Sequence, residues 1–300
     1  MKENAHRLRI QTSMFFDDTI KYLRNGGVPL LKIVHPFSQY LLCNHYYGDE
    51  LVTEQTGITP DALLLENGES VKENDIVHVQ VNHFQKFVRT ILPSIEVSFV
   101  LSTGQWQFPQ LHKDAVTDAV LNDTRVIAWI SQNPIYTHPK YIAFPYGIRL
   151  SNLQDYAQAL LHQRGKTTNV AALFIDKNTN ACRRSIPSSD ACSVRDFYTK
   201  VQEAEFVLSP IGDRDDCYRH YEAIGLGTTP ISNVREEYKQ LFGESMVYSS
   251  VEDMVSGASP PSAAHHPQKE LVCLDYHRHR INELVCKLQA SRKRSLPSSP

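Results

Sequence analysis

The segment "SPIGDRDDCYRHYEAIGLGTTPI", residues 209–231, places charged side chains directly after a short apolar run. The preceding "AEFVL" has the composition of a buried strand. After Gly212 come several acids, then an Arg, a His and a Glu at helical spacing, and glycines with "TTPI" close the segment. Open α/β sheets bind their ligands at the carboxyl ends of their strands. The segment therefore predicts an α/β fold with a ligand site where this helix begins.

The size and charge of the chain limit the classes of protein it can belong to. Its 300 residues suggest two domains, and its formal net charge of −2 argues against a nucleic-acid-binding protein. No run reaches the roughly 18 apolar residues of a membrane span, and the N-terminal "MKENAHRLRI" lacks the apolar core of a signal peptide. We therefore expect a soluble, cytoplasmic protein, although a trimmed secreted enzyme would look similar. The sequence gives no indication of its oligomeric state.

The cysteines point to the same compartment. The chain has six, scattered and without a C-x-x-C pair. This usage favours free thiols in a reducing environment over a disulfide framework or a zinc site.

Apolar runs bounded by turn residues alternate along the chain with segments of helical spacing. In the first half we expect a helix at 83–95 and strands at 30–37, 75–81, 96–104 and 125–134. In the second half we expect strands at 169–175, 205–210, 228–232 and 245–250, and helices at 150–163, 193–204, 216–227 and 270–289. This alternation predicts parallel sheets covered by helices.

The helix in the opening segment carries a pattern that suits a nucleotide. We expect Asp216 to be its N-cap, and Arg219 and Glu222, three residues apart, to share one face. An Arg near a helix N-terminus can hold phosphate oxygens, and a carboxylate one turn later can accept hydrogen bonds from the two hydroxyls of a ribose. An ordinary surface ion pair, worth less than ~1 kcal/mol, explains the spacing equally well.

Two other interpretations of this region are weaker. "GLGTTP" is not a dinucleotide-binding loop, because its glycines close a helix and Pro230 stands where the third glycine should be. "DRD" at 213–215 resembles the D-x-D motif that binds Mg²⁺ or Mn²⁺ in one class of glycosyltransferases. In that class the motif lies mid-chain, whereas here less than a third of the chain follows it.

The stretch "FVLSPIGDRDDCYRHYEAIGLGTTPI" resembles the F-x-L-x-P-x-G…D-x-x-R-x-x-E-A-x-x-x-G-x-x-P-I block of exostosin-like glycosyltransferases. "SQNPIYTHPKYIAFPYGI" and "NDIVHV…LPSIEVSFVLSTG" also resemble segments of that family, so the resemblance spans roughly residues 75 to 250. It implies a GT-B fold, with two Rossmann-like domains facing a central cleft. It also implies inverting transfer of a sugar from a UDP-sugar to a glycan acceptor.

This resemblance sets the expected domains. We predict an acceptor-binding domain over 1–135 and a nucleotide-sugar-binding domain over 136–270. A C-terminal helix at 271–290 and a disordered tail at 291–300 would follow. The boundary falls in "PIYTHPKYIAFPYGIRL", which is rich in proline and has no clear period.

The resemblance also assigns roles to single residues. It implies that Arg219 contacts the diphosphate and Glu222 the ribose, while Gly212 lets the backbone approach the nucleotide. Ser209 and Tyr218 belong to the same block, and Arg184, beside Arg183 after the strand at 169–175, is a further candidate. The family's loop is usually glycine-rich and uncharged, whereas this one reads "GDRDD". We expect no cofactor and no metal ligands, but the acids leave a divalent metal possible.

Inverting transfer also needs a base that takes the proton of the acceptor hydroxyl. The candidates lie in the N-terminal half, and His83 is preferred because it directly follows the strand at 75–81. The others are Asp17, Asp18, His35 and Glu54. Xylose is a weak preference for the sugar, because a small member needs no extra pocket for a C6 group. A non-catalytic module that binds a glycan or a nucleotide is the alternative.

Overall fold

The computed structural model describes residues 14–49, 56–104, 110–257 and 266–295. The chain divides into two compact units, each made from two stretches. Residues 1–35 and 145–276 form one, which we call the four-stranded unit, and residues 36–144 and 277–300 form the other, the six-stranded unit.

This division differs from the linear one predicted at residue 135. The N-terminal stretch joins the four-stranded unit because Val34 donates its backbone N–H to the carbonyl of Val272 (2.9 Å) and accepts from Ile148 (2.8 Å). Most of the C-terminal helix joins the six-stranded unit. Both additions depend on contacts between residues far apart in the chain, which periodicity does not reveal.

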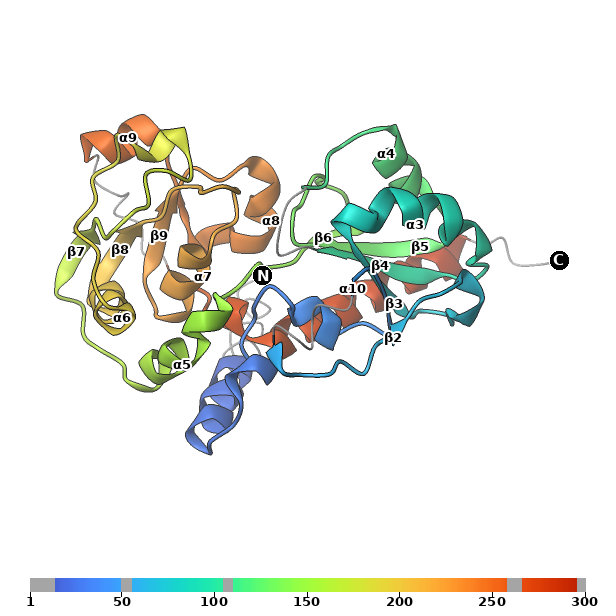
Figure 1. The fold of residues 1–300 in the computed structure, drawn as a ribbon, viewed down its shortest axis with the longest axis horizontal. Helices are drawn as coiled ribbons and strands as arrows, with labels where there is room; N and C mark the ends of the chain where they lie inside the picture. The colour runs from blue at the N-terminus through green and yellow to red at the C-terminus, as the bar shows by residue number, and fades with distance from the viewer. Residues whose placement is uncertain (1–13, 50–55, 105–109, 258–265, 296–300) are drawn as a thin grey trace. The chain divides into compact units, whose positions relative to one another are not determined.

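The six-stranded unit is built on a parallel sheet with the strand order β2-β1-β3-β4-β5-β6 (Figure 1). Its strands are β1 (His45–Tyr47), β2 (Leu63–Leu64), β3 (Ile76–Gln80), β4 (Phe99–Gly104), β5 (Val126–Ser131) and β6 (Tyr141–Ala143). Every residue of β4 and β5 is buried, as expected for central parallel strands covered on both faces. Its helices are α3 (Phe84–Thr90) and α4 (Ala115–Asn122). The ring of Phe84 stacks on Trp129, with centroids 5.6 Å apart.

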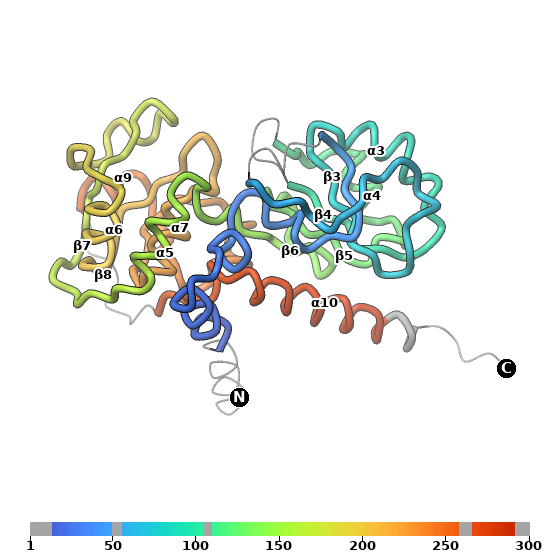
Figure 2. Tube along the Cα trace, turned by 60° about the horizontal axis from the view of Figure 1, so that its bottom comes forward, coloured from blue at the N-terminus to red at the C-terminus, as the bar shows by residue number. Residues whose placement is uncertain are grey.

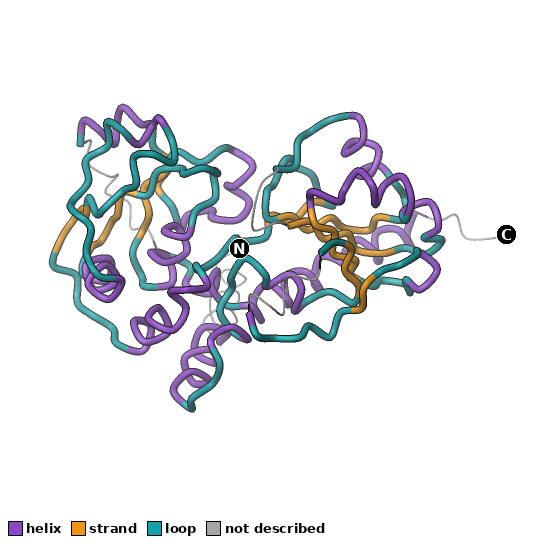
Figure 3. Tube along the Cα trace, in the orientation of Figure 1, coloured by secondary structure: helices purple, strands orange, loops and turns teal. Residues whose placement is uncertain are grey.

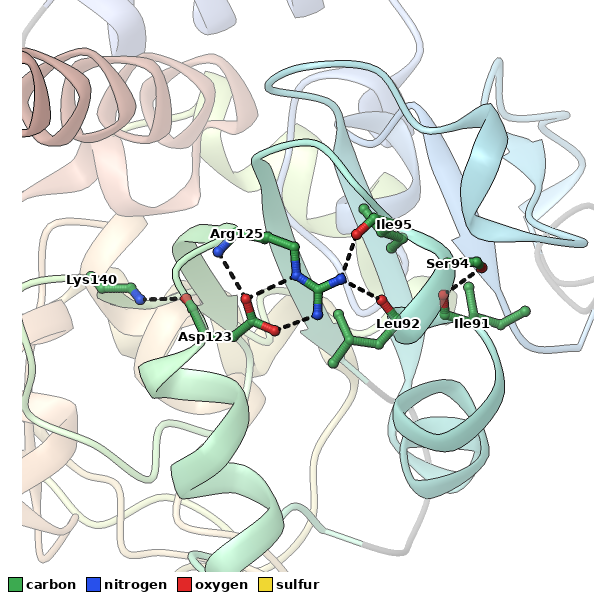
Figure 4. Close-up of polar contacts among 7 residues, drawn as sticks. All are labelled: Ile91, Leu92, Ser94, Ile95, Asp123, Arg125 and Lys140. Atoms are coloured by element: carbon green, nitrogen blue, oxygen red, sulfur yellow. Dashed lines mark hydrogen bonds and ion pairs between the residues drawn. The ribbon is translucent and has the colours of Figure 1, made fainter.

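Figure 4 shows that Arg125 connects the turn before β5 to the turn that follows α3. The Arg125 side chain forms two hydrogen bonds with the Asp123 carboxylate, at 3.1 and 2.7 Å, and donates to the carbonyls of Leu92 (3.0 Å) and Ile95. The guanidinium holds the pKa of Asp123 below its usual value. It thereby connects Asp123 to the backbone carbonyls of the 3₁₀ turn that follows α3.

The four-stranded unit has a parallel sheet in the order β10-β9-β8-β7. Figure 3 draws the strands of both sheets in orange. Its strands are β7 (Thr168–Ala171), β8 (Ala204–Leu208), β9 (Thr229–Ser232) and β10 (Val247–Tyr248). Its helices cover residues 14–24, α5 (Leu153–Leu161), α6 (Val194–Gln202), α7 (Tyr218–Gly225), α8 (Lys239–Phe242) and α9 (Val251–Ser256). Apolar side chains from β8, β9, β10 and α9 form one core cluster with Ile175 and Ile186.

Most predicted elements are confirmed within a few residues, and two parallel α/β sheets agree with Rossmann-like domains. The strand predicted at 30–37 is wrong. A 3₁₀ turn covers Pro29–Leu31, and only Ile33 forms a bridge, antiparallel to Cys273. The sequence analysis missed α4, although Asp114 and Thr117 form a capping box at its start. The GT-B arrangement of the two units stays a prediction.

The last helix, α10 (Leu274–Ser295), is the continuous red coil of Figure 2. It continues into the stretch 291–300 predicted as a disordered tail, and residues 296–300 lie outside the described part. His277 on this helix is buried against Phe144, with ring centroids 5.2 Å apart. No helix among the described residues combines the length and the apolar character needed to cross a lipid bilayer.

Candidate functional site

A pocket of about 400 Å³ lies in the four-stranded unit, beside the start of α7 and the loops that follow β7 and β8. This volume is within the range of small-molecule sites. The residues that line it are Arg149, Asn152, Phe174, Asp176, Thr179, Arg183, Cys192, Val194, Phe197, Gly212, Asp213, Cys217, Tyr218, Arg219 and Glu222. The pocket therefore contains Gly212, Tyr218, Arg219 and Glu222, all four predicted from the opening segment.

The N-terminus of α7 differs from the prediction. Its N-cap is Cys217, without a side-chain cap bond, and not Asp216. The Asp216 carboxylate turns inward, where Oδ2 accepts from the backbone N–H of Tyr146 (3.0 Å) and the hydroxyl of Tyr221 (2.8 Å). Its Oδ1 has no hydrogen-bond partner, and burial raises the pKa of Asp216 to about 7. Asp216 thus joins α7 to the segment before α5.

Glu222 is a buried carboxylate in the pocket wall, 6% exposed. Its Oε1 accepts a hydrogen bond from the Tyr198 hydroxyl at 2.9 Å. Burial raises the pKa of Glu222, while the Tyr198 hydrogen bond and the charge of Arg219 oppose that rise. A buried carboxylate needs hydrogen-bond donors to stay ionised. Asn152 in the pocket wall also interacts with the Glu222 carboxylate, so a ligand hydroxyl would add to the donors that the protein supplies.

Arg219 lines the pocket, but two of its side-chain nitrogens already donate hydrogen bonds to backbone carbonyls. Its Nη1 donates to the carbonyl of Leu208 at 3.2 Å, and its Nη2 donates to the carbonyl of Phe174. The guanidinium also lies over the Phe197 ring, 5.3 Å from its centroid. Arg219 and Glu222 form no ion pair, so the surface-pair interpretation of their spacing is wrong. Burial lowers the pKa of Arg219.

Arg183 holds the loop that contains Gly212. It donates from Nε to the carbonyl of Ile211 (2.6 Å) and from Nη2 to that of Pro210 (2.9 Å), while Nη1 bonds Thr179 (3.0 Å). A Cβ on Gly212 would lie only 3.0 Å from Arg183 Nη2. Glycine therefore permits this close approach.

The structure does not bring Ser209 or Arg184 to the pocket. The Ser209 hydroxyl is fully buried, 2.7 Å from Nδ1 of His220, whose Nε2 lies 3.1 Å from the carbonyl of Asp215. Because a carbonyl only accepts, Nε2 carries the proton and Ser209 donates to Nδ1. Burial lowers the pKa of His220 to about 4, so the ring stays neutral. Arg184 is exposed and is not a lining residue.

The acids of the loop separate into different environments. Asp213 is exposed and lines the pocket, whereas Asp215 forms an ion pair with Arg235. Within the described ranges, no group of three or more His, Cys, Asp or Glu side chains is placed to hold a metal ion. The D-x-D interpretation therefore has no third ligand among the described residues.

The candidate bases lie in different places. His83 belongs to the six-stranded unit, directly after β3, and its Nε2 lies 3.2 Å from Oδ1 of Asp49. His35 is buried, and burial lowers its pKa to about 4. Asp17 and Asp18 are exposed on the helix at 14–24, and Glu54 lies outside the described residues.

The sequence analysis missed two kinds of pocket residue. Arg149 and Asn152 come from the segment before α5, and Phe174 is an exposed aromatic at the end of the β7 region. Arg149 follows the quoted "FPYGI", so proximity to that motif was an available signal. The side chain of Tyr218 packs against Tyr146 of the same motif, with ring centroids 5.0 Å apart.

Residues 159–244 match the family model of the RXYLT1 C-terminal domain. This is an exostosin-like xylosyltransferase family, so the resemblance to exostosin-like glycosyltransferases is confirmed over this segment. The segment contains every pocket residue from Phe174 to Glu222, whereas Arg149 and Asn152 precede it. A search of curated proteins finds no match to the chain.

Proposed function

We propose that the protein is an inverting glycosyltransferase of GT-B architecture that transfers a sugar from a UDP-sugar to a glycan acceptor. The observation that carries the proposal is the buried Glu222, which shares a 400 Å³ pocket with three guanidinium groups inside or next to the matched segment. Xylose is the preferred sugar, and the name of the matched family supports that choice.

In this proposal the pocket holds the nucleotide part of the donor. Glu222 accepts a hydrogen bond from Tyr198, and the ribose hydroxyls supply further donors to the carboxylate, which has four lone-pair sites. The guanidinium groups face the diphosphate and stabilise the negative charge that grows as it leaves. Because arginines supply this charge, we propose that transfer needs no divalent metal.

The acceptor half of the reaction is assigned to His83. Because Asp49 Oδ1 lies beside Nε2, that nitrogen holds the proton and Nδ1 is the acceptor. In a single displacement, Nδ1 takes the proton of the acceptor hydroxyl as its oxygen bonds the anomeric carbon. The bond from that carbon to the diphosphate oxygen breaks, and UDP leaves with its electron pair.

The test combines donor binding with turnover. UDP binding is measured by calorimetry for the wild type, Glu222→Ala and the control Glu205→Ala, which changes an exposed glutamate on β8. We expect Glu222→Ala to weaken UDP binding about ten- to a hundredfold, because a hydrogen bond to a charged group contributes about 1.5–3 kcal/mol. The control should bind as the wild type does. Unchanged UDP affinity in a folded Glu222→Ala protein would overturn the assignment.

Turnover is measured as hydrolysis and transfer over a panel of UDP-sugars, with UDP-xylose expected to be the best donor. All pocket residues belong to the four-stranded unit, so a non-catalytic nucleotide-binding module would share the same site. Tight UDP binding without hydrolysis or transfer of any sugar would favour that alternative.

A further inference from the structure

The three arginines of the pocket do not have the same partners. Arg183 donates to the carbonyls of Pro210 and Ile211, and Arg219 donates to those of Leu208 and Phe174. Some of the N–H groups of both side chains are therefore already bonded to backbone carbonyls. Their bonds join the loops after β7 and β8 and so hold the shape of the pocket wall.

Arg149 differs from both. Its side chain is exposed and lines the pocket, and it has no hydrogen-bond or ion-pair partner among the described residues. All five N–H groups of its guanidinium are therefore available to a ligand. Its charge also acts on Glu222 and Tyr218, which line the same pocket.

The backbone below Arg149 is held in place. Gly147 has φ +82°, and a Cβ there would meet the carbonyl oxygen of Val34 at 2.3 Å, so only glycine fits. Ile148 donates its N–H to the same carbonyl at 2.8 Å, and Tyr146 donates its N–H to Asp216. The backbone at Arg149 is therefore fixed relative to α7, the helix that carries Glu222.

We propose that Arg149 is the principal phosphate-binding residue of this pocket, and that Arg183 and Arg219 mainly shape it. The inference rests on the proposed function and changes the residue expected to hold the diphosphate, which the family resemblance assigned to Arg219. The planar guanidinium fork of an arginine with free donors can bind two phosphate oxygens at once. A lysine at the same position would supply the charge but not the paired hydrogen bonds.

The test separates the phosphate contact from the nucleoside contact. UDP and uridine are titrated by calorimetry into the wild type, Arg149→Gln, Arg149→Lys and the matched control Arg184→Gln, an exposed arginine outside the pocket. We expect Arg149→Gln to weaken UDP binding about ten- to a hundredfold and to leave uridine binding unchanged. Arg149→Lys should recover part of the UDP affinity, and Arg184→Gln should match the wild type for both ligands.

The results that oppose the inference differ from those that oppose the proposed function. Equal UDP affinity of the wild type and Arg149→Gln overturns the inference alone. A parallel loss of UDP and uridine binding also overturns it, because Arg149 would then act on the pocket as a whole. A wild type that binds neither ligand overturns the proposed function and the inference with it. Thermal melting of each variant verifies that the fold is intact.

Discussion

At the carboxyl ends of its strands, the four-stranded unit has a pocket of about 400 Å³, whereas the six-stranded unit packs carboxamide side chains there. Gln39 donates to Ser102 Oγ (2.8 Å) and to the carbonyl of Thr103 (3.2 Å), and its Oε1 occupies the space where a Cβ on Gly104 would lie. Gln132 donates to the carbonyl of Pro36 at 2.8 Å. The two sheets share parallel topology, so the described side chains at these strand ends differ although the topology does not.

The two edges differ in which side chains donate hydrogen bonds to the backbone carbonyls near the strand ends. Among the described residues of the six-stranded unit, the buried neutral amides of Gln39 and Gln132 bond to carbonyls at this edge. In the four-stranded unit, arginines bind the carbonyls, and the charges they bring stay beside an open cavity. A guanidinium in a partly water-excluded cavity interacts strongly with a phosphate, whereas an amide carries no net charge. On the proposed function, the nucleotide binds in the four-stranded unit and proton transfer falls to His83 of the six-stranded unit.

The largest effect is expected from His83→Ala, which tests the six-stranded side of this comparison. Loss of a general base typically lowers the rate by ~10²–10⁴, so turnover should fall by that factor while UDP affinity stays constant. Asp49→Asn, which removes the charge beside Nε2, should give a smaller loss. Transfer by His83→Ala at the wild-type rate would make His83 structural and direct the search to Glu54 and to Asp17, Asp18 and His35, which belong to the four-stranded unit.

The second prediction concerns how the buried carboxyl of Asp216 makes the stability of the protein depend on pH. Burial raises its pKa in the folded protein to about 7 from the ordinary 3.8, so between these values the folded state keeps a proton that the unfolded chain has lost. The contribution of this group to stability is therefore greatest below pH 4 and falls as pH rises towards 7, by up to about 1.4 kcal/mol per pH unit.

Asp216→Asn should remove this dependence. The stability of the variant relative to the wild type, from urea unfolding at pH 4.5, 5.5 and 6.5, should therefore rise with pH. A difference that stays constant over this range would show that Asp216 is ionised in the folded protein.

A smaller effect is expected for the amides of the six-stranded unit. Gln80 donates to the hydroxyl of Tyr40 (2.7 Å) and accepts from the backbone N–H of Asp49 (3.0 Å). Gln80→Leu should cost about 1–3 kcal/mol of stability, because it leaves buried polar groups without partners. UDP affinity should not change, since Gln80 does not line the pocket. Denaturant unfolding measures the first effect and calorimetry the second, and weaker UDP binding would contradict the division of roles.

The smallest expected effect is that of metal removal. The pocket contains three guanidinium groups, and Asp215 is paired with Arg235, so we expect full activity in excess EDTA. Activity that EDTA abolishes and Mn²⁺ restores would instead make Asp213 and Asp215 metal ligands.

Local patterns predicted the elements that build the pocket. The apolar run before Ser209 and the spacing of Arg219 and Glu222 were sufficient to predict β8, α7 and the positions of two pocket side chains. The three-residue spacing did not reveal that Arg219 binds carbonyls and that Glu222 binds Tyr198, because both partners come from other elements.

Contacts between distant segments explain the features of the fold and of the pocket that local patterns did not predict. Asp216 has the composition of an N-cap, but the backbone N–H of Tyr146 and the hydroxyl of Tyr221 draw it inward. The segment before Arg149 is held by contacts such as that of Gly147 with Val34, more than a hundred residues earlier. Such pairings have no periodic signature in the sequence. The chain passes between the units at 144/145, inside the predicted boundary stretch, but the addition of the N-terminal stretch to the four-stranded unit and the free arginine escaped prediction.

The central claim, that this pocket binds the nucleotide, can be tested on the unmodified chain through two exposed cysteines. Cys192 lines the pocket, and Cys286 lies on α10 in the six-stranded unit, so it serves as an internal control. Alkylation of both thiols by N-ethylmaleimide is followed by mass spectrometry with and without UDP. At a UDP concentration ten times Kd, modification of Cys192 should slow about tenfold, because only the free protein reacts, while Cys286 reacts at the same rate. Unchanged alkylation of Cys192 under UDP that calorimetry shows to be bound would place the nucleotide elsewhere and contradict the account.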